Sequence, residues 1–339
     1  FDKSTGKERE VSTGEFALIR EKLGKEGEWA NYEVRGDDRT GSFRYFREGA
    51  RGQNYFLLDA LRGLDDVFVE VRSKLGKSHA EVVARMDQAL GDMGRIRRGE
   101  EAALASQKEL QARLASALSD VGAALDASGI KLKKPKNRGP SWDALVESLS
   151  IPETALWTTF ITARGHPEEH VIEALEVFRA LRFFRHIPPA ENVYAVSHPK
   201  YKGSAASPSA VKAQVMLKLL DRVQAMGSND HMQDVLTPDA KGARKLHLWG
   251  FSDDDFGNYE TALKVLSEQM KPSKEYPNGR WPDVKITLFF TGNPNNTKEK
   301  PRTVVLTPDG GFRPALASEL HEARKINCNQ YNARILSYP

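Results

Sequence analysis

Thr162, Ala163 and Arg164 follow a short apolar segment at 157–161, and their types suit the binding of an anionic oxygen. A hydroxyl group and backbone N–H groups at the end of a strand donate hydrogen bonds without having to lose a proton. These residues are therefore candidates for phosphate binding. The alternative is that Thr162 is simply a buried residue at a strand end.

Lys212 is the second candidate, in the early turns of a helix that Ser207-Pro208 is expected to open. An ammonium group beside a helix N-terminus offers an anion a point charge together with the positive end of the helix dipole. The alternative is a solvated surface lysine.

Three consecutive carboxylates, Asp253, Asp254 and Asp255, follow an apolar segment at 245–249. Adjacent carboxylates repel one another by about 1 kcal/mol per pair at 4 Å in water, and by more in a drier site. A cation would relieve this repulsion, and Mg²⁺ accepts oxygen ligands while needing only one or two carboxylates. The sequence therefore predicts a Mg²⁺ site here without fixing which aspartate binds. The alternative is an acidic helix cap.

The elements that must position these residues alternate between strands and helices beyond residue 150. Apolar strand candidates occur at 157–161, 192–196, 245–249 and 284–290, and helices are expected to begin near Pro167, Pro208 and Asn258. This alternation predicts an α/β fold, a Rossmann-like and mainly parallel sheet with helices on both faces. Ligands of such sheets bind at the carboxyl ends of the strands, so we expect the three groups to converge there.

Taken in chain order, the threonine, lysine and aspartate segments resemble the second, third and fourth motifs of the haloacid dehalogenase-like (HAD) superfamily of phosphohydrolases, over residues 155–310. The resemblance implies that Thr162 binds the phosphoryl oxygens, Lys212 neutralises them and an aspartate of 253–255 helps to hold Mg²⁺. It implies a Mg²⁺-dependent phosphatase-like hydrolase that forms an aspartyl-phosphate intermediate on a phosphorylated small molecule or macromolecule.

The first motif of this family, a strand ending in Asp-x-Asp-x-Thr, does not occur in the sequence. Residues 1–4 resemble the segment that family members carry immediately after that motif, so we expect the nucleophile and the first strand upstream of Phe1. Three alternatives remain: another chain supplies the strand, the strand order differs, or Asp2 of the segment 2–6 is the nucleophile. A different class of function also remains, a catalytically inactive HAD-like binding or structural protein of a larger assembly.

The predicted domains are a mostly helical cap at 1–150 and the α/β core at 151–339. Within the cap, apolar residues spaced three and four apart predict a helical hairpin at about 78–127. A basic segment at 131–140, rich in helix breakers, is expected to be an exposed linker. Caps of this kind exclude water and select the substrate.

Composition excludes several classes of protein. The 339 residues carry 50 Lys and Arg against 46 Asp and Glu, a net charge of +4, which is too small to indicate nucleic-acid binding despite the basic run at 131–138. One cysteine, Cys328, cannot form an intrachain disulfide, so a cytoplasmic location is expected. The apolar runs are shorter than the roughly 18 to 20 residues that cross a bilayer. The sequence does not indicate the substrate.

Overall fold

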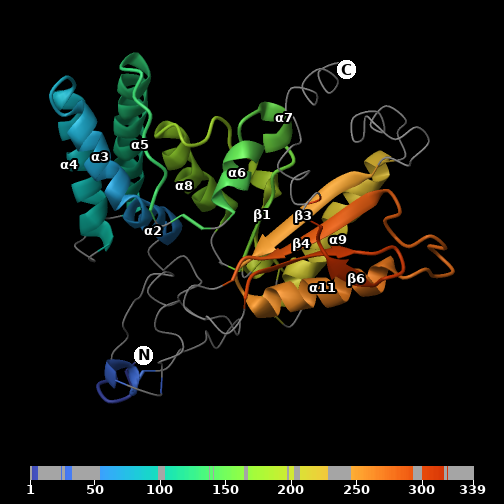
Figure 1. The fold of residues 1–339 in the computed structure, drawn as a ribbon. Helices are drawn as coiled ribbons and strands as arrows, with labels where there is room; N and C mark the ends of the chain where they lie inside the picture. The colour runs from blue at the N-terminus through green and yellow to red at the C-terminus, as the bar shows by residue number, and fades with distance from the viewer. Residues whose placement is uncertain are drawn as a thin grey trace. The chain divides into compact units, whose positions relative to one another are not determined.

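The chain separates into two compact units, each with its own elements (Figure 1). The first comprises residues 1–139 and 146–200, and the second comprises 140–145 and 201–339. Helices and small sheets occur together, so the mixed α/β class predicted from the sequence is confirmed. The structure is a computed structural model, and its described residues are 2–6, 24, 27–32, 54–97, 104–136, 138–139, 141–163, 167–196, 198–201, 207–227, 246–292, 300–316 and 319.

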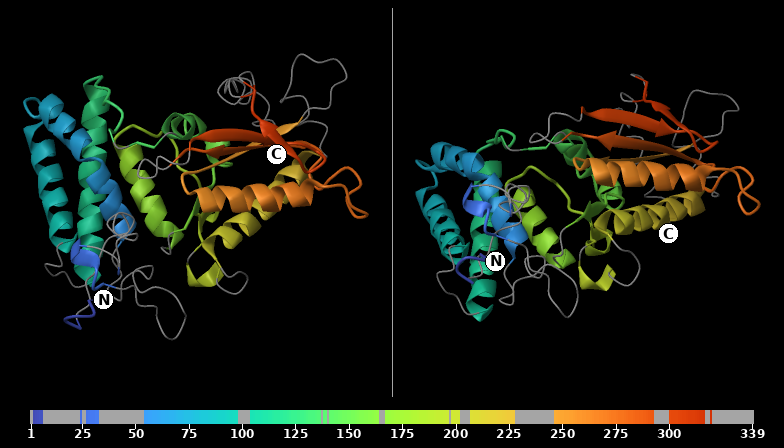
Figure 2. Two further views of the ribbon diagram at one scale, coloured as in Figure 1. Left: turned by 60° about the horizontal axis from the view of Figure 1, so that its bottom comes forward. Right: turned by 90° about the horizontal axis from the view of Figure 1, so that it is seen from below.

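Helices dominate the first unit. After the short η1 (Gly27–Trp29), they are α2 (Tyr55–Gly63), α3 (Asp65–Leu75), α4 (Ala80–Arg97), α5 (Leu104–Ala127), α7 (Pro152–Ala155) and α8 (Glu168–Ala180). Helices α4 and α5 pack side by side (Figures 1 and 2). The buried residues that recur every three or four positions on these two helices are Val83, Met86, Met93, Leu114, Leu118, Val121 and Leu125. One apolar stripe on each helix therefore covers the other.

Helix α8 completes the core of this unit. Its residues Ala174 and Val177, together with Leu181 directly after the helix, are buried in the same hydrophobic cluster as α2 to α5. Packing thus divides the chain near residue 200 rather than at residue 150, because the apolar face of α8 is covered by the helices that precede it.

The first unit also holds a two-stranded parallel sheet. Strand β1 (Phe160–Thr162) pairs with β2 (Val193–Ala195), which follows η3 (Ala190–Asn192), and Thr162 lies opposite Ala195. The strand predicted at 192–196 is therefore present with shorter bounds, and the one predicted at 157–161 is shorter and ends one residue later, at Thr162. Pro167 precedes α8 as its N-cap residue instead of occupying its first turn.

The second unit is a four-stranded sheet with two long helices on one face (Figure 2). The strands are β3 (His247–Asp253), β4 (Val284–Phe290), β5 (Arg302–Leu306) and β6 (Phe312–Pro314), in that spatial order. The two helices are α9 (Pro208–Gly227) and α11 (Phe256–Met270). Alternate residues of β4 are buried, as expected for a strand with one face against helices. Two short elements, α6 (Trp142–Ser148) and η4 (Pro199–Tyr201), span the boundaries between the units.

The sheet of the second unit is only partly parallel. Strands β3 and β4 are parallel, whereas β5 and β6 add an antiparallel hairpin that the sequence analysis missed. The turn Thr307-Pro308-Asp309-Gly310-Gly311 joins these strands, and Gly310 has φ +81°. Proline, aspartate and glycine between two apolar segments are a turn signal, so this hairpin could have been predicted from the sequence. The described strands thus form two small sheets instead of one parallel sheet.

The basic segment at 131–140 lies against α3. Lys133 and Lys136 donate their backbone N–H groups to Glu70 and Asp66, at 3.0 Å each, while their side chains remain exposed. The segment is therefore attached to the first unit through its backbone, although its lysine side chains face solvent as expected. In the described part of the chain, no helix has both the length and the apolar character required to cross a membrane.

Candidate functional site

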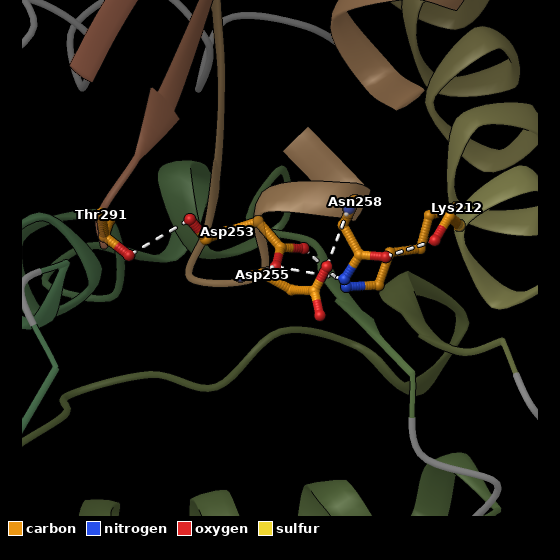
Figure 3. Close-up of polar contacts among 6 residues, drawn as sticks. Lys212, Asp253, Asp255, Asn258 and Thr291 are labelled. Carbon is orange, nitrogen blue, oxygen red and sulfur yellow. Dashed lines mark hydrogen bonds and ion pairs between the residues drawn. The ribbon is translucent and has the colours of Figure 1, made fainter. Parts of the chain in front are cut away.

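Lys212 and Asp253 form a buried ion pair in the second unit (Figure 3). The Lys212 Nζ lies 2.6 Å from Asp253 Oδ2, and each side chain is 6% exposed. Asp253 is the last residue of β3, and Lys212 is in the second turn of α9, the helix that packs against β3 and β4. The structure thus brings together two residues that the sequence analysis had singled out from separate segments. The surface-lysine alternative for Lys212 is wrong, because helix and sheet bury the side chain.

The Asp253 carboxylate is held by three donors. In addition to Lys212, the Asp255 backbone N–H donates to Oδ1 at 2.9 Å and the Asn258 side-chain amide donates to the same oxygen at 3.2 Å. Thr291 donates both its backbone N–H and its hydroxyl to the Asp253 carbonyl, at 3.0 and 3.2 Å. These contacts fix the end of β3, since side chain and main chain are both hydrogen-bonded.

Asp255 acts as the N-cap of α11. Its Oδ1 accepts a hydrogen bond from the Asn258 backbone N–H at 3.0 Å, and its backbone is extended, with φ −92° and ψ 118°. The helix therefore begins at Phe256, slightly before the expected position near Asn258. The cap interpretation that the sequence left open is confirmed for Asp255.

Asp254 is exposed, and within the described residues its side chain forms no hydrogen bond or ion pair. The three adjacent carboxylates thus have separate environments: Asp253 is paired with a lysine, Asp255 caps a helix and Asp254 faces solvent. No three histidine, cysteine, aspartate or glutamate side chains of the described ranges gather in a group that could hold a metal ion. The assignment of Asp253–Asp255 as Mg²⁺ ligands stays a prediction.

Thr162 and Ala163 belong to the first unit, whereas Lys212 and Asp253 belong to the second. Thr162 ends β1, is half-buried and accepts a hydrogen bond on its carbonyl from the Val196 N–H at 2.8 Å. The strand-end position predicted for it is confirmed, and its convergence with Lys212 stays a prediction. Arg164 and Cys328 lie outside the described residues.

Asn258 belongs to the site, but the sequence analysis named it only as the expected start of a helix. It is 9% exposed, donates its side-chain amide to Asp253 and accepts a hydrogen bond from the Ser209 hydroxyl at 2.7 Å. The signal that could have identified it is its spacing: a polar residue three positions after an N-cap lies in the first turn of the helix, near the residue that ends the preceding strand.

Helix α9 is also held near its C-terminal end, by residues that precede β4. Arg280 binds Asp221 through Nε and Nη2 at 2.9 and 2.7 Å, and the Trp281 indole N–H donates to the same carboxylate at 2.8 Å. The hydrogen bonds with Asp221 raise the pKa of Arg280 above its ordinary value. Gln224 donates to Asp283 at 2.6 Å. Lys212 therefore lies on a helix that is fixed at both ends.

An aromatic cluster lies beside the ion pair on the helix-covered face. Phe290 is opposite Asp253 in the sheet, and its ring packs on Phe256 and Tyr259 of α11. The Arg302 guanidinium lies 4.8 Å from the Phe256 ring centroid. Burial raises the pKa of Tyr259, and the nearby Arg302 charge acts in the opposite direction. The pair is thus flanked by apolar surface, which strengthens its electrostatic interaction.

Comparison of the chain with protein-family models, with curated proteins and with solved structures found no match.

Proposed function

We propose that the chain is part of a Mg²⁺-dependent phosphatase-like hydrolase of the HAD class, with a Rossmann-like core and a helical cap. Its substrate would be a phosphorylated small molecule or macromolecule, and the reaction would pass through an aspartyl-phosphate intermediate. The observation that supports the proposal is the Lys212–Asp253 pair, because both residues were predicted to serve one phosphoryl group and they lie 2.6 Å apart at a strand end.

Lys212 is suited to neutralising phosphoryl oxygens. An ammonium group has three N–H donors, and Asp253 accepts one of them. The two others have no acceptor within the described residues, so an anion that reached the pair could accept hydrogen bonds from them. A buried cation aimed at developing negative charge is an effective source of transition-state stabilisation.

The oxygen donors at this strand end fit Mg²⁺. Asp253 Oδ2 accepts one hydrogen bond and keeps a lone pair, and the Asp254 carboxylate is exposed. Mg²⁺ binds one or two carboxylates and takes water and phosphate oxygens as its other ligands, so these two residues are sufficient. Asp255 is less suited because its Oδ1 caps α11. Bound Mg²⁺ would disperse the negative charge of the phosphoryl group.

A second candidate function is a HAD-like binding or structural component that lacks catalysis. The observation that favours it is that three protein donors contact the Asp253 carboxylate, which accounts for its buried charge without any ligand.

Hydrolysis of para-nitrophenyl phosphate by the full-length protein, with Mg²⁺ and after its removal by EDTA, tests the proposal. We expect Mg²⁺-dependent release of phosphate that falls by about 100-fold or more in Lys212→Met, because a charge-stabilising donor is lost. Lys218→Met is the matched control, since Lys218 is an exposed lysine on the same helix. Circular dichroism establishes that each variant is folded.

Undiminished activity in folded Lys212→Met would contradict the proposed role of this lysine. Full-length protein that releases no phosphate with Mg²⁺ from a panel of phosphate esters would contradict the hydrolase and support the binding or structural protein. Thr162→Val tests the threonine separately, and we expect a loss of activity there as well.

A further inference from the structure

We propose that Ser209 and Asn258 form a positioning pair, which orients the Asp253 carboxylate and thereby fixes the ammonium group of Lys212. The inference rests on the proposed function for its catalytic consequence. The positioning itself concerns contacts within the second unit and is testable without any activity.

The contacts form one continuous chain across three elements, and Figure 3 shows those among Asn258, Asp253 and Lys212. The Ser209 hydroxyl, in the first turn of α9, donates to Asn258 Oδ1 at 2.7 Å. The Asn258 amide, in the first turn of α11, donates to Asp253 Oδ1 at 3.2 Å, and the Lys212 ammonium donates to Asp253 Oδ2 at 2.6 Å. The chain of contacts therefore begins and ends on α9 and passes through α11 and β3.

Ser209 holds the Asn258 amide in the orientation that the Asp253 carboxylate requires. An amide offers an acceptor oxygen on one side and an NH₂ donor on the other, and only the donor side can contact a carboxylate favourably. The NH₂ group therefore faces Asp253, and the amide oxygen faces Ser209, whose hydroxyl donates to it. Loss of the hydroxyl would remove one of the two side-chain contacts that hold the amide in place.

Asn258 in turn determines which carboxylate oxygen meets the lysine. With Oδ1 occupied by the Asn258 amide and the Asp255 N–H, Oδ2 is the oxygen left for Lys212. The carboxylate plane is thus fixed by neutral donors, and the lysine charge takes the position that this plane allows. A side chain that acts in this way is a positioning residue and not a catalytic one.

The reactivity of individual lysines toward acetic anhydride, read by mass spectrometry on the folded protein, tests the positioning pair. We expect Ser209→Ala and Asn258→Leu to raise acetylation of Lys212 by about fivefold, the value of one lost hydrogen bond, with Lys218 unchanged. Ser209→Thr keeps the hydroxyl and is expected to retain the low reactivity of the native chain. Ser252→Ala removes a hydroxyl next to Asp253 that bonds to Ser141 instead, so it should have no effect.

Native reactivity of Lys212 in folded Ser209→Ala would overturn the inference, even if Asn258→Leu does not fold. Leu266→Ala, a buried change on α11 away from the positioning pair, controls for general destabilisation and should leave the ratio of Lys212 to Lys218 acetylation unchanged. In the phosphatase assay, we expect Ser209→Ala to lower kcat and leave KM nearly unchanged.

Raised acetylation in a chain without phosphatase activity would uphold the positioning pair and refute the hydrolase. Unchanged acetylation in an active enzyme that needs Lys212 would refute the positioning pair and uphold the hydrolase.

Discussion

The Lys212–Asp253 pair is costly to bury, and its hydrogen-bond partners are what make it tolerable. Charges taken out of water lose hydration that their mutual attraction does not always restore, and apolar replacements are often as stable. Here the carboxylate gains two further donors, from Asp255 and Asn258, which offset part of its lost hydration. An ion pair of this kind is expected to contribute little net stability, so the presence of two buried charges agrees with the proposed role of Lys212 in binding an anion.

Single residues also set how stability depends on pH. His247, the first residue of β3, is buried, and burial lowers its pKa below the ordinary value of 6.5, although the Asp283 carboxylate acts in the opposite direction. Below pH 6.5 the unfolded chain binds a proton that the folded chain does not, so stability should fall as the pH decreases, by at most about 1.4 kcal/mol per pH unit. Urea unfolding at pH 5.5 and 7.5 measures this difference.

His247→Gln should reduce this pH dependence, whereas His79→Gln, at a partly exposed residue just before α4, should leave it as in the native chain. An identical pH dependence in the native protein and in His247→Gln would show that burial of this imidazole does not govern the titration.

At the scale of elements, the start of α11 depends on one cap. Asp255 satisfies a backbone N–H that the first turn of the helix leaves without a partner. Asp255→Ala should therefore lower the free energy of unfolding by about 1 kcal/mol, within a range of roughly 0.5 to 2. Asp254→Ala is the matched control, because that neighbouring carboxylate is exposed and its loss should cost less than about 0.5 kcal/mol. Equal losses in the two variants, measured by urea unfolding, would contradict the assignment of the cap to Asp255.

The sequence predicts best those elements in which the spacing of apolar residues alone indicates a helix or a strand. The strand at 284–290 has the predicted bounds, since alternate residues face helices on one side. The strand predicted at 245–249 in fact extends to Asp253 and includes Gly250 and Ser252. Its end was predicted too early because these last residues are not apolar. Which carboxylate meets a lysine depends on how α9 packs on the sheet, a tertiary contact that no local pattern encodes. Asn258 was missed although its position three residues after the N-cap Asp255 is a local signal.

At the scale of the whole molecule, each unit has its own buried core. Among the described residues, the hydrophobic cluster of the first unit contains residues from α2 to α5 and from α8 and the residue after it, and none from the second unit. In the second unit the fully buried side chains come from the two helices and the sheet they cover, such as Met216, Leu266 and Leu288. Because hydrophobic stabilisation comes from the contacts a side chain makes, a cavity should act first on the unit that contains it.

Leu118→Ala and Leu288→Ala test this independence. Both side chains are almost fully buried, in α5 and in β4, so each substitution should cost about 2 to 5 kcal/mol. Hydrogen exchange followed by mass spectrometry should show lower protection in α4 and α5 for Leu118→Ala, and in β3 and β4 for Leu288→Ala, with the other unit close to native. Val69→Ala, at an exposed position of α3, should change neither. If either core substitution lowered protection equally in both units, the two cores would unfold as one cooperative body, and the independence of the two units would be contradicted.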